Sequence, residues 1–452
     1  MSSYLEGRLT HRPLFYRIRP HCDCTSFAGE FALNLPQTRP SSRIFYGWYV
    51  LGASFLILFV SSGAAFSFGV MFKPMIADLG WSRSAISSAF FLNMSVYAFS
   101  LIITGKLYDR YGPKWVIVFS TICFSAGYVS IATVNSLSQF LLFYGVISAA
   151  GLGGTTIPIF AALVSKWFEK SRGLAISLAL SGACLGQFVL VPLFTTFVLR
   201  YGWRKSYVWI GLITLVVNIV LALTVLRADP DELGIKPYGW KDSGQQDVKP
   251  GSSQHGEVRD LNFSQAIRTP SFWLFLVVMF ICGSGDFLVT THLVPMVTDY
   301  GISPSTGGHM LAWFGLMALP GILLAGPASD LIGTKIPIAL TFTLRVALFL
   351  MVLKYHSAVS FYIFSLLFGL TFLVTAPLTP VLVGRLYGLS YVGILSGFIT
   401  TIHHLGGGFW AYMGGVIFDK TGSYSLAFSI SAVMALAAVI GMLLIKEERH
   451  AP

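Results

Sequence analysis

The chain has 452 residues, of which 55% are hydrophobic and only 11% charged, and its mean hydropathy is +0.72. A soluble protein carries about a quarter charged residues, and the apolar residues here come in runs of about 20, long enough for a membrane-crossing helix. Because backbone polar groups in lipid must be bonded within each segment, this composition excludes a soluble fold and predicts an all-α membrane protein in the lipid bilayer. Much of the net charge of +11 lies before residue 45 and in short loops, which is typical of membrane topology, so we expect no nucleic-acid partner.

The apolar runs predict twelve transmembrane helices, six on each side of a polar stretch. Residues 1–44 contain scattered Arg, Pro and polar residues and no apolar core of a signal peptide, so we expect a disordered cytoplasmic tail. We expect one six-helix bundle at 45–227, a soluble cytoplasmic linker at 228–269, a second bundle at 270–446 and a cytoplasmic tail at 447–452. The expected spans are roughly 46–70, 85–107, 115–134, 137–163, 173–198, 206–226, 271–297, 307–328, 336–353, 358–383, 391–417 and 424–445.

The second half of the chain repeats the first in the same order. A short charged hairpin after the second span has a counterpart after the eighth, and the register extends without gaps over the preceding loop. Such a register indicates two copies of one unit, which in a membrane protein is a parallel repeat. In the hairpins, Gly105, Asp109, Gly112 and Lys114 correspond to Gly326, Asp330, Gly333 and Lys335, and in the loops Pro74, Asp78, Gly80 and Ser82 correspond to Pro295, Asp299, Gly301 and Ser303.

Lysine and arginine predict the orientation. They are more frequent in the flanks on the side of the two hairpins than in the opposite flanks, and basic flanks stay in the cytoplasm. We therefore expect a multi-pass protein of the cell membrane with both termini in the cytoplasm.

Several motifs resemble those of a known family. Twelve spans as six plus six, with Gly-x-Leu-x-Asp-Arg-x-Gly-x-Lys at 105–114, resemble the major facilitator superfamily. Trp-Phe-Glu-Lys-Ser-Arg-Gly-Leu-Ala at 167–175 resembles the signature of monocarboxylate porters, and Gly-Trp-Ser-Arg at 80–83 resembles the bacterial monocarboxylate and oxalate/formate porters. One departure is that Ala318, Ile322 and Phe66 stand where that group carries an acidic residue, an arginine and a lysine. The usual anion clamp is therefore missing.

The resemblance implies a role for the hairpins. Asp109, Arg110 and Lys114, with Asp330 in the second half, would latch one half against the other and separate when that side opens. Gly105 marks the start of the first hairpin, and Gly112 permits its tight turn. The alternative is a solvated loop that only sets the topology.

Three ionisable residues within spans are candidates for substrate binding or coupling. Arg345 lies mid-span and either pairs within the second half or binds an anion. Asp286 is isolated in an apolar segment, where desolvation favours the neutral carboxyl, so it either takes up a proton or serves as a structural hydrogen-bonding group. His292 is nearer the outer end and is either a site residue or an interfacial one.

Further candidates lie on the faces of three spans. His403 and His404 adjoin, and we expect at most one of them to face the cavity. Tyr144 and Thr155 lie on a face of the fourth span that is rich in small and polar residues, and Thr375 lies on a similar face of the tenth span. Both faces either contact the substrate or pack against neighbouring helices. The two histidines lack a third ligand in the sequence, so we expect no metal and no cofactor.

These features predict a secondary active transporter that works by alternating access, and not an enzyme. By resemblance, its small-molecule substrate is an organic anion of the monocarboxylate kind, moved in symport with protons or by exchange. One alternative is an exporter of amphipathic or cationic compounds, with Asp286 recognising the cation. Another is a membrane nutrient sensor that signals through the linker or the tail. The exporter would bind its substrate through Phe66, Phe68, Phe368 and Trp313.

Overall fold

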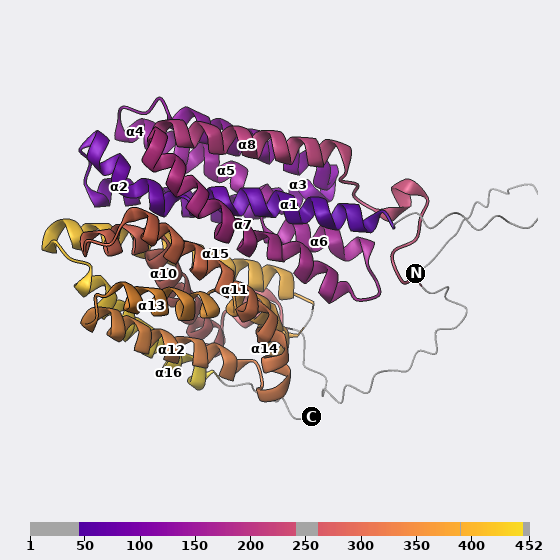
Figure 1. Ribbon diagram of the computed structural model, residues 1–452. Helices are drawn as coiled ribbons and strands as arrows, with labels where there is room; N and C mark the ends of the chain where they lie inside the picture. Colours follow the sequence, from indigo (N-terminus) through magenta and orange to yellow (C-terminus); the bar gives the residue numbers. More distant parts are fainter. Residues whose placement is uncertain (1–44, 241–260, 389, 446–452) are drawn as a thin grey trace, which may run out of the picture. The chain divides into compact units, whose positions relative to one another are not determined.

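The computed structural model describes residues 45–240, 261–388 and 390–445 (Figure 1). The tails expected at 1–44 and 447–452, and the middle of the linker, lie outside these ranges. The described residues are helical over most of their length and belong to one compact unit.

The first half, drawn from indigo to magenta in Figure 1, contains the helices up to α8. They are α1 (Gly47–Phe66), α2 (Phe68–Leu79), α3 (Arg83–Ile131), α4 (Leu137–Phe140), the π-helix η1 (Leu141–Ser148), α5 (Ala149–Leu152), the 3₁₀ helix η2 (Gly153–Thr155), α6 (Ile157–Trp167), α7 (Arg172–Tyr201) and α8 (Trp203–Thr224).

The second half, in orange to yellow, follows a short 3₁₀ helix η3 (Pro230–Leu233). Its helices are α9 (Phe263–Ala266), α10 (Pro270–Asp299), α11 (Pro304–Ile332), α12 (Lys335–Lys354), α13 (Ala358–Phe372), α14 (Thr375–Tyr387), α15 (Val392–Thr421) and α16 (Ser425–Leu444).

Ten stretches are long and apolar enough to cross a membrane. One of them, α3, contains two spans, because Gly112 has a non-helical φ of 76°. The chain reverses there: Ser100 and Ser120, on either side of Gly112, pack against the neighbouring Gly153 and Gly154. Helix α15 is not among the ten, since its histidines, threonines and glycines make it less apolar, but it has the same length as α10 and packs along it. With these two the described residues contain the twelve expected spans.

The repeat is visible in the backbone. Gly112 has φ 76° and ψ 167°, and Gly333 has φ 80° and ψ 162°, a region that favours glycine. Ser82 caps α3 and Ser303 caps α11 with the same bond from a backbone N–H three residues on. Equivalent sequence positions thus form equivalent turns and caps.

Three of the expected spans are not continuous helices. The first is interrupted at Ser67, between α1 and α2. The fourth is divided into α4, η1, α5, η2 and α6, with an extended residue at Thr156 (φ −118°, ψ 171°) just before Pro158. The tenth breaks between α13 and α14. The glycines of the fourth span approach neighbouring helices so closely that an added Cβ at Gly151 would collide with the α3 backbone. Tertiary packing therefore overrides the regular helix expected there.

Both described ends of the linker dock onto the bundles. Tyr238 donates its backbone N–H to Trp167 O (2.9 Å), and Glu169 donates to Tyr238 O (3.0 Å). At the other end, Leu261 N donates to Tyr387 O (2.9 Å). The linker is thus attached to the loop after α6 in the first half and to the end of α14 in the second.

Candidate functional site

The site is a cavity of about 360 Å³ between the two halves. Helices α1, α2, α3 and α7 of the first half and α10, α11, α13, α14 and α15 of the second all contribute to its wall. Its polar lining includes the carboxyl group of Asp286 and the rings of His403 and His404, and among the described residues the lining contains no lysine or arginine. The aromatic lining residues are Phe66, Phe68, Phe90, Tyr97, Phe287 and Phe372.

An ion pair lies in the wall of this cavity. Arg345 Nη2 of α12 is 2.7 Å from Asp286 Oδ1 of α10, and both side chains are 1% exposed. Asp286 belongs to the cavity lining, whereas Arg345 lies behind it. The pair leaves this part of the wall without net charge, and pairing within the second half is one of the two alternatives that the sequence offers for Arg345.

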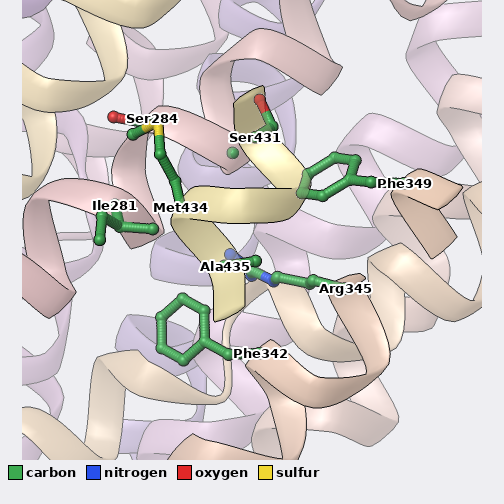
Figure 2. Close-up of a pocket in the computed structure, with 9 residues that line it drawn as sticks. Ile281, Ser284, Phe342, Arg345, Phe349, Ser431, Met434 and Ala435 are labelled. Carbon is green, nitrogen blue, oxygen red and sulfur yellow. The ribbon is translucent and has the colours of Figure 1, made fainter. Parts of the chain in front are cut away.

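All three guanidinium nitrogens of Arg345 are engaged. Nε donates to Thr371 Oγ1 (3.0 Å), Nη2 also donates to Thr371 O (3.1 Å), and Nη1 donates to Cys282 O (3.4 Å). The ring of Phe368 lies 4.7 Å from the guanidinium carbon. Figure 2 shows the side chain beside Phe342 and Phe349, next to a void of about 10 Å³, which is room for one water molecule at most.

The two histidines of α15 both line the cavity, so the expectation that at most one would do so was wrong. Adjacent residues on a helix point about 100° apart, and the cavity is wide enough to receive both. His403 Nε2 is 3.8 Å from Asp286 Oδ2. His404 Nδ1 is 2.8 Å from Thr400 O, and its ring packs edge-on against Tyr97 of the first half at 4.9 Å.

The remaining candidates are dispersed. Thr155 and Thr375 line the cavity, and Thr375 Oγ1 is 3.5 Å from Cys282 Sγ. Tyr144 is buried between the rings of Phe68 and Phe140 and does not line the cavity. His292 is fully buried between helices, 2.9 Å from Tyr424 OH and 2.7 Å from Ala411 O, and likewise lies outside the lining.

The hairpin end is the end of the bundles that carries Gly112 and Gly333. Asp109, Arg110 and Asp330 are exposed there, and in the described part of the chain they form no ion pair between the halves. Lys335 donates to Ile445 O within the second half. A Cβ added at Gly105 would meet no other group within 4 Å, and the Lys114 ammonium lies 5.9 Å from the centre of the Trp115 ring.

The opposite end, which carries Arg83, Asp299 and Asp419, is held closed by contacts between the halves. Arg83 of α3 contacts Asp299 of α10 through both guanidinium Nη atoms (2.8 and 2.9 Å), and Lys73 Nζ is 2.6 Å from the same carboxylate. Asp419 of α15 accepts hydrogen bonds from the backbone N–H groups of Arg83 (3.0 Å) and Ser84 (2.8 Å), so it caps α3 from the other half. Sequence reasoning missed this cluster, although Arg83 belongs to the porter-like motif at 80–83.

A metal ion has little electrostatic support in this wall. The ligand atoms of Cys282, Asp286 and His403 lie within 4.8 Å of one another, a spacing that suits a cation. The guanidinium of Arg345 already supplies Asp286 with a positive partner and lies 3.6 Å from Cys282 Sγ. A second cation would be repelled by it, so we assign no metal to these groups.

Twelve membrane-crossing segments in two repeated halves around a central cavity define a membrane transporter. The model of the Major Facilitator Superfamily matches residues 54–296 and 275–452, and the chain belongs to that superfamily of secondary transporters, not to an enzyme family.

Curated relatives and solved structures agree with this assignment. The chain is 27% identical over 406 residues to an uncharacterized MFS-type transporter, YcxA, of Bacillus subtilis (87% of this chain, 94% of the relative) and 24% identical over 401 residues to monocarboxylate transporter 13 of Bos taurus (87% of each). It is 26% identical over 275 residues to the oxalate:formate antiporter of Oxalobacter formigenes (60% of each). Its fold is similar to that of the nucleoside transporter NupG (TM-score 0.65, 11% identity, 88% of this chain and 98% of that one). It is also similar to a bacterial homologue of the lysosomal transporter Spinster in an inward-facing conformation (TM-score 0.63, 17% identity, 89% and 95%).

Proposed function

We propose that this transporter carries a small organic anion of the monocarboxylate kind in symport with a proton. The observation that carries the proposal is the cavity wall formed by Asp286, His403 and His404, with Arg345 behind it. These three lining groups can hold or release a proton, whereas the fixed charge of Arg345 is already balanced. The names of two relatives, a monocarboxylate transporter and an oxalate:formate antiporter, support an organic anion as substrate.

The transport cycle would be alternating access in the cell membrane, with the hairpin end in the cytoplasm. A ligand can drive such a cycle only through different affinities for the two conformations. In the conformation described, contacts between the halves close the opposite end, and the lining runs from Phe66 and Phe68 toward Leu101 and Ile157, nearer the hairpin end. Asp109, Arg110 and Asp330 would form their latch only when the hairpin end closes.

Uptake into proteoliposomes tests the proposal. The purified chain would be reconstituted and presented with labelled pyruvate under an imposed pH gradient. We expect accumulation above equilibrium that collapses when a protonophore dissipates the gradient. Accumulation that ignores the gradient but requires a second anion inside the vesicle would instead indicate exchange.

The aromatic lining favours a second candidate, the export of amphipathic cations. Phe66 and Phe68 line the cavity, but Phe368 and Trp313 do not: Phe368 covers Arg345, and Trp313 is exposed and packs against Phe188. Asp286 is also already neutralised by Arg345, which weakens its attraction for a cation. Efflux of a lipophilic cation that exceeds transport of any organic acid would favour this candidate.

A further inference from the structure

We propose that His404 is the anion-binding group of the cavity, and that its ligand is a monocarboxylate with an apolar body that enters together with one proton. This rests on the proposed function and specifies which group of that site binds the anion. Three features of the described residues support it: the cavity lining offers no arginine or lysine, no carboxylate pairs with His404, and most of the surrounding wall is apolar.

The described lining contains no lysine or arginine, and Arg345 cannot replace one. Its Nε, Nη1 and Nη2 atoms already contact Thr371, Cys282 and Asp286, and it lies outside the lining. An entering carboxylate would therefore find no permanent positive charge. A positive charge must come from a group that gains a proton, and the lining histidines are the basic groups there.

The two histidines are not equivalent. His403 Nε2 faces Asp286 at 3.8 Å, so an imidazolium at His403 already has a carboxylate beside it. His404 Nδ1 is bonded to Thr400 O, and because a carbonyl oxygen only accepts, Nδ1 carries the hydrogen in the neutral ring. Nε2 is then the nitrogen that takes up a proton, and within the described ranges no carboxylate contacts it. The substrate would supply that missing counter-ion.

The charges around the two histidines favour one proton for each carboxylate. The titratable or charged groups that face them are Tyr97 of α3, Cys282 and Asp286 of α10 and Arg345 of α12. Asp286 and Arg345 cancel each other, so the wall is neutral before the ligand enters. A carboxylate and a protonated His404 keep it neutral, and neutrality is favourable because an unpaired charge is costly among protein groups of low dielectric.

The residues around His404 favour an apolar group on the part of the ligand that lies beyond its carboxylate. The ring of Phe287 lies 5.8 Å from that of His404, and Tyr97 lies on its other flank. A volume of about 360 Å³ exceeds what pyruvate needs and accommodates an aromatic ring. A dianion such as oxalate would need a second positive charge, and protonating His403 as well would place two like charges 5.1 Å apart, between ring centres.

Binding of labelled benzoate to the purified full-length chain at about pH 6 and about pH 8 tests this assignment. We expect the wild type to bind at least about tenfold more tightly at the lower pH, because one proton taken up with each anion changes the affinity by up to about tenfold for each pH unit. His404→Gln, which keeps a polar side chain but cannot become a cation, should lose that gain and bind equally weakly at both pH values. The matched control is His309→Gln, because His309 is exposed on α11 and outside the cavity lining; it should behave like the wild type.

Two further measurements do not depend on how well His404→Gln folds. His404→Lys introduces a permanent cation, so its benzoate affinity should become independent of pH over the same range. Unlabelled oxalate should compete with benzoate on the wild-type chain at least about tenfold less well than phenylacetate.

The assignment is overturned if His404→Gln retains the affinity and pH dependence of the wild type, or if oxalate competes as well as phenylacetate. The failure of the proposed function would look different. In that case the wild-type chain would bind no organic acid at either pH.

Discussion

Two of the arginines that form ion pairs in the described part of the chain, Arg83 and Arg345, lie in different surroundings. Arg83 joins the halves at the opposite end, where its side chain is 11% exposed and that of its partner Asp299 is 27% exposed. Arg345 pairs with Asp286 inside the second half, where both side chains are 1% exposed. A contact that must separate in each transport cycle costs less to break where water can enter, whereas a buried pair without its partner is strongly destabilising. We therefore expect Arg83 to belong to a gate that opens during transport, and Arg345 to a part of the cavity wall that stays paired.

The largest effect is expected from removing the buried cation. Arg345→Gln leaves the Asp286 carboxylate without its partner in an apolar wall, so we expect a loss of about 3–5 kcal/mol in stability. Thermal melting of the purified chain in one detergent would measure it. The double variant Asp286→Asn with Arg345→Gln removes both charges and should recover most of the loss. If the single variant melts like the wild type, Arg345 is not the counter-charge that the geometry indicates.

A smaller effect, on conformation rather than folding, is expected from Arg83→Gln. It removes the contacts to Asp299 and Tyr424 and the stacking on Phe418, all between the halves. We expect the conformation in which the opposite end is closed to lose about 1–3 kcal/mol of stability. The equilibrium should then shift toward the conformation that is open at that end. A thiol reagent should then reach Met75→Cys, buried on α2 in this conformation, faster than in the parent. Met75→Cys, with and without Arg83→Gln, would be made in a variant that lacks the native cysteines, so that the reagent labels residue 75 alone.

The sequence predicts the number of spans and the repeat, because both depend on local properties. Hydropathy identifies apolar runs, and the two turns at Gly112 and Gly333 depend on a backbone angle that favours glycine. The breaks in the fourth and tenth spans were not predictable in this way. They depend on close contacts such as that of Gly153 with Ser100, which only the packed helices create.

The candidate site was predictable only in part. Isolated charges in apolar spans need partners, so Asp286 and Arg345 were identified, but their pairing depends on how α10 and α12 pack. Cys282, one helical turn before Asp286, was a local signal that could have been used. The Arg83 cluster joins segments far apart in the chain, and Asp299 and Asp419 lie just beyond the ends of the expected spans, where charge is ordinary.

Lys73→Gln tests whether the exposed part of the gate contributes less than Arg83. Lys73 is 34% exposed and contacts only one oxygen of Asp299, which Arg83 continues to hold in the variant. An ion pair of this kind contributes about 0.2–1 kcal/mol and is screened by salt. We therefore expect a slight rise in the labelling rate at Met75→Cys, below that of Arg83→Gln, which disappears at high ionic strength. A rise equal to that of Arg83→Gln would place the lysine at the centre of the gate.

The smallest effect on stability is expected at the hairpin end, from Asp109→Asn. Asp109 is exposed, and the structure gives it no ion pair within the described ranges, so its loss should change stability by less than about 0.5 kcal/mol. If the proposed latch forms only when the hairpin end closes, the same variant should slow transport although it melts normally. Asp330→Asn is the matched variant in the second copy, and a latch built from the repeat should show a similar defect there. Normal transport by both variants would leave the hairpins with a topological role only, and would confine gating by charged side chains to the end where Arg83 and Asp299 meet.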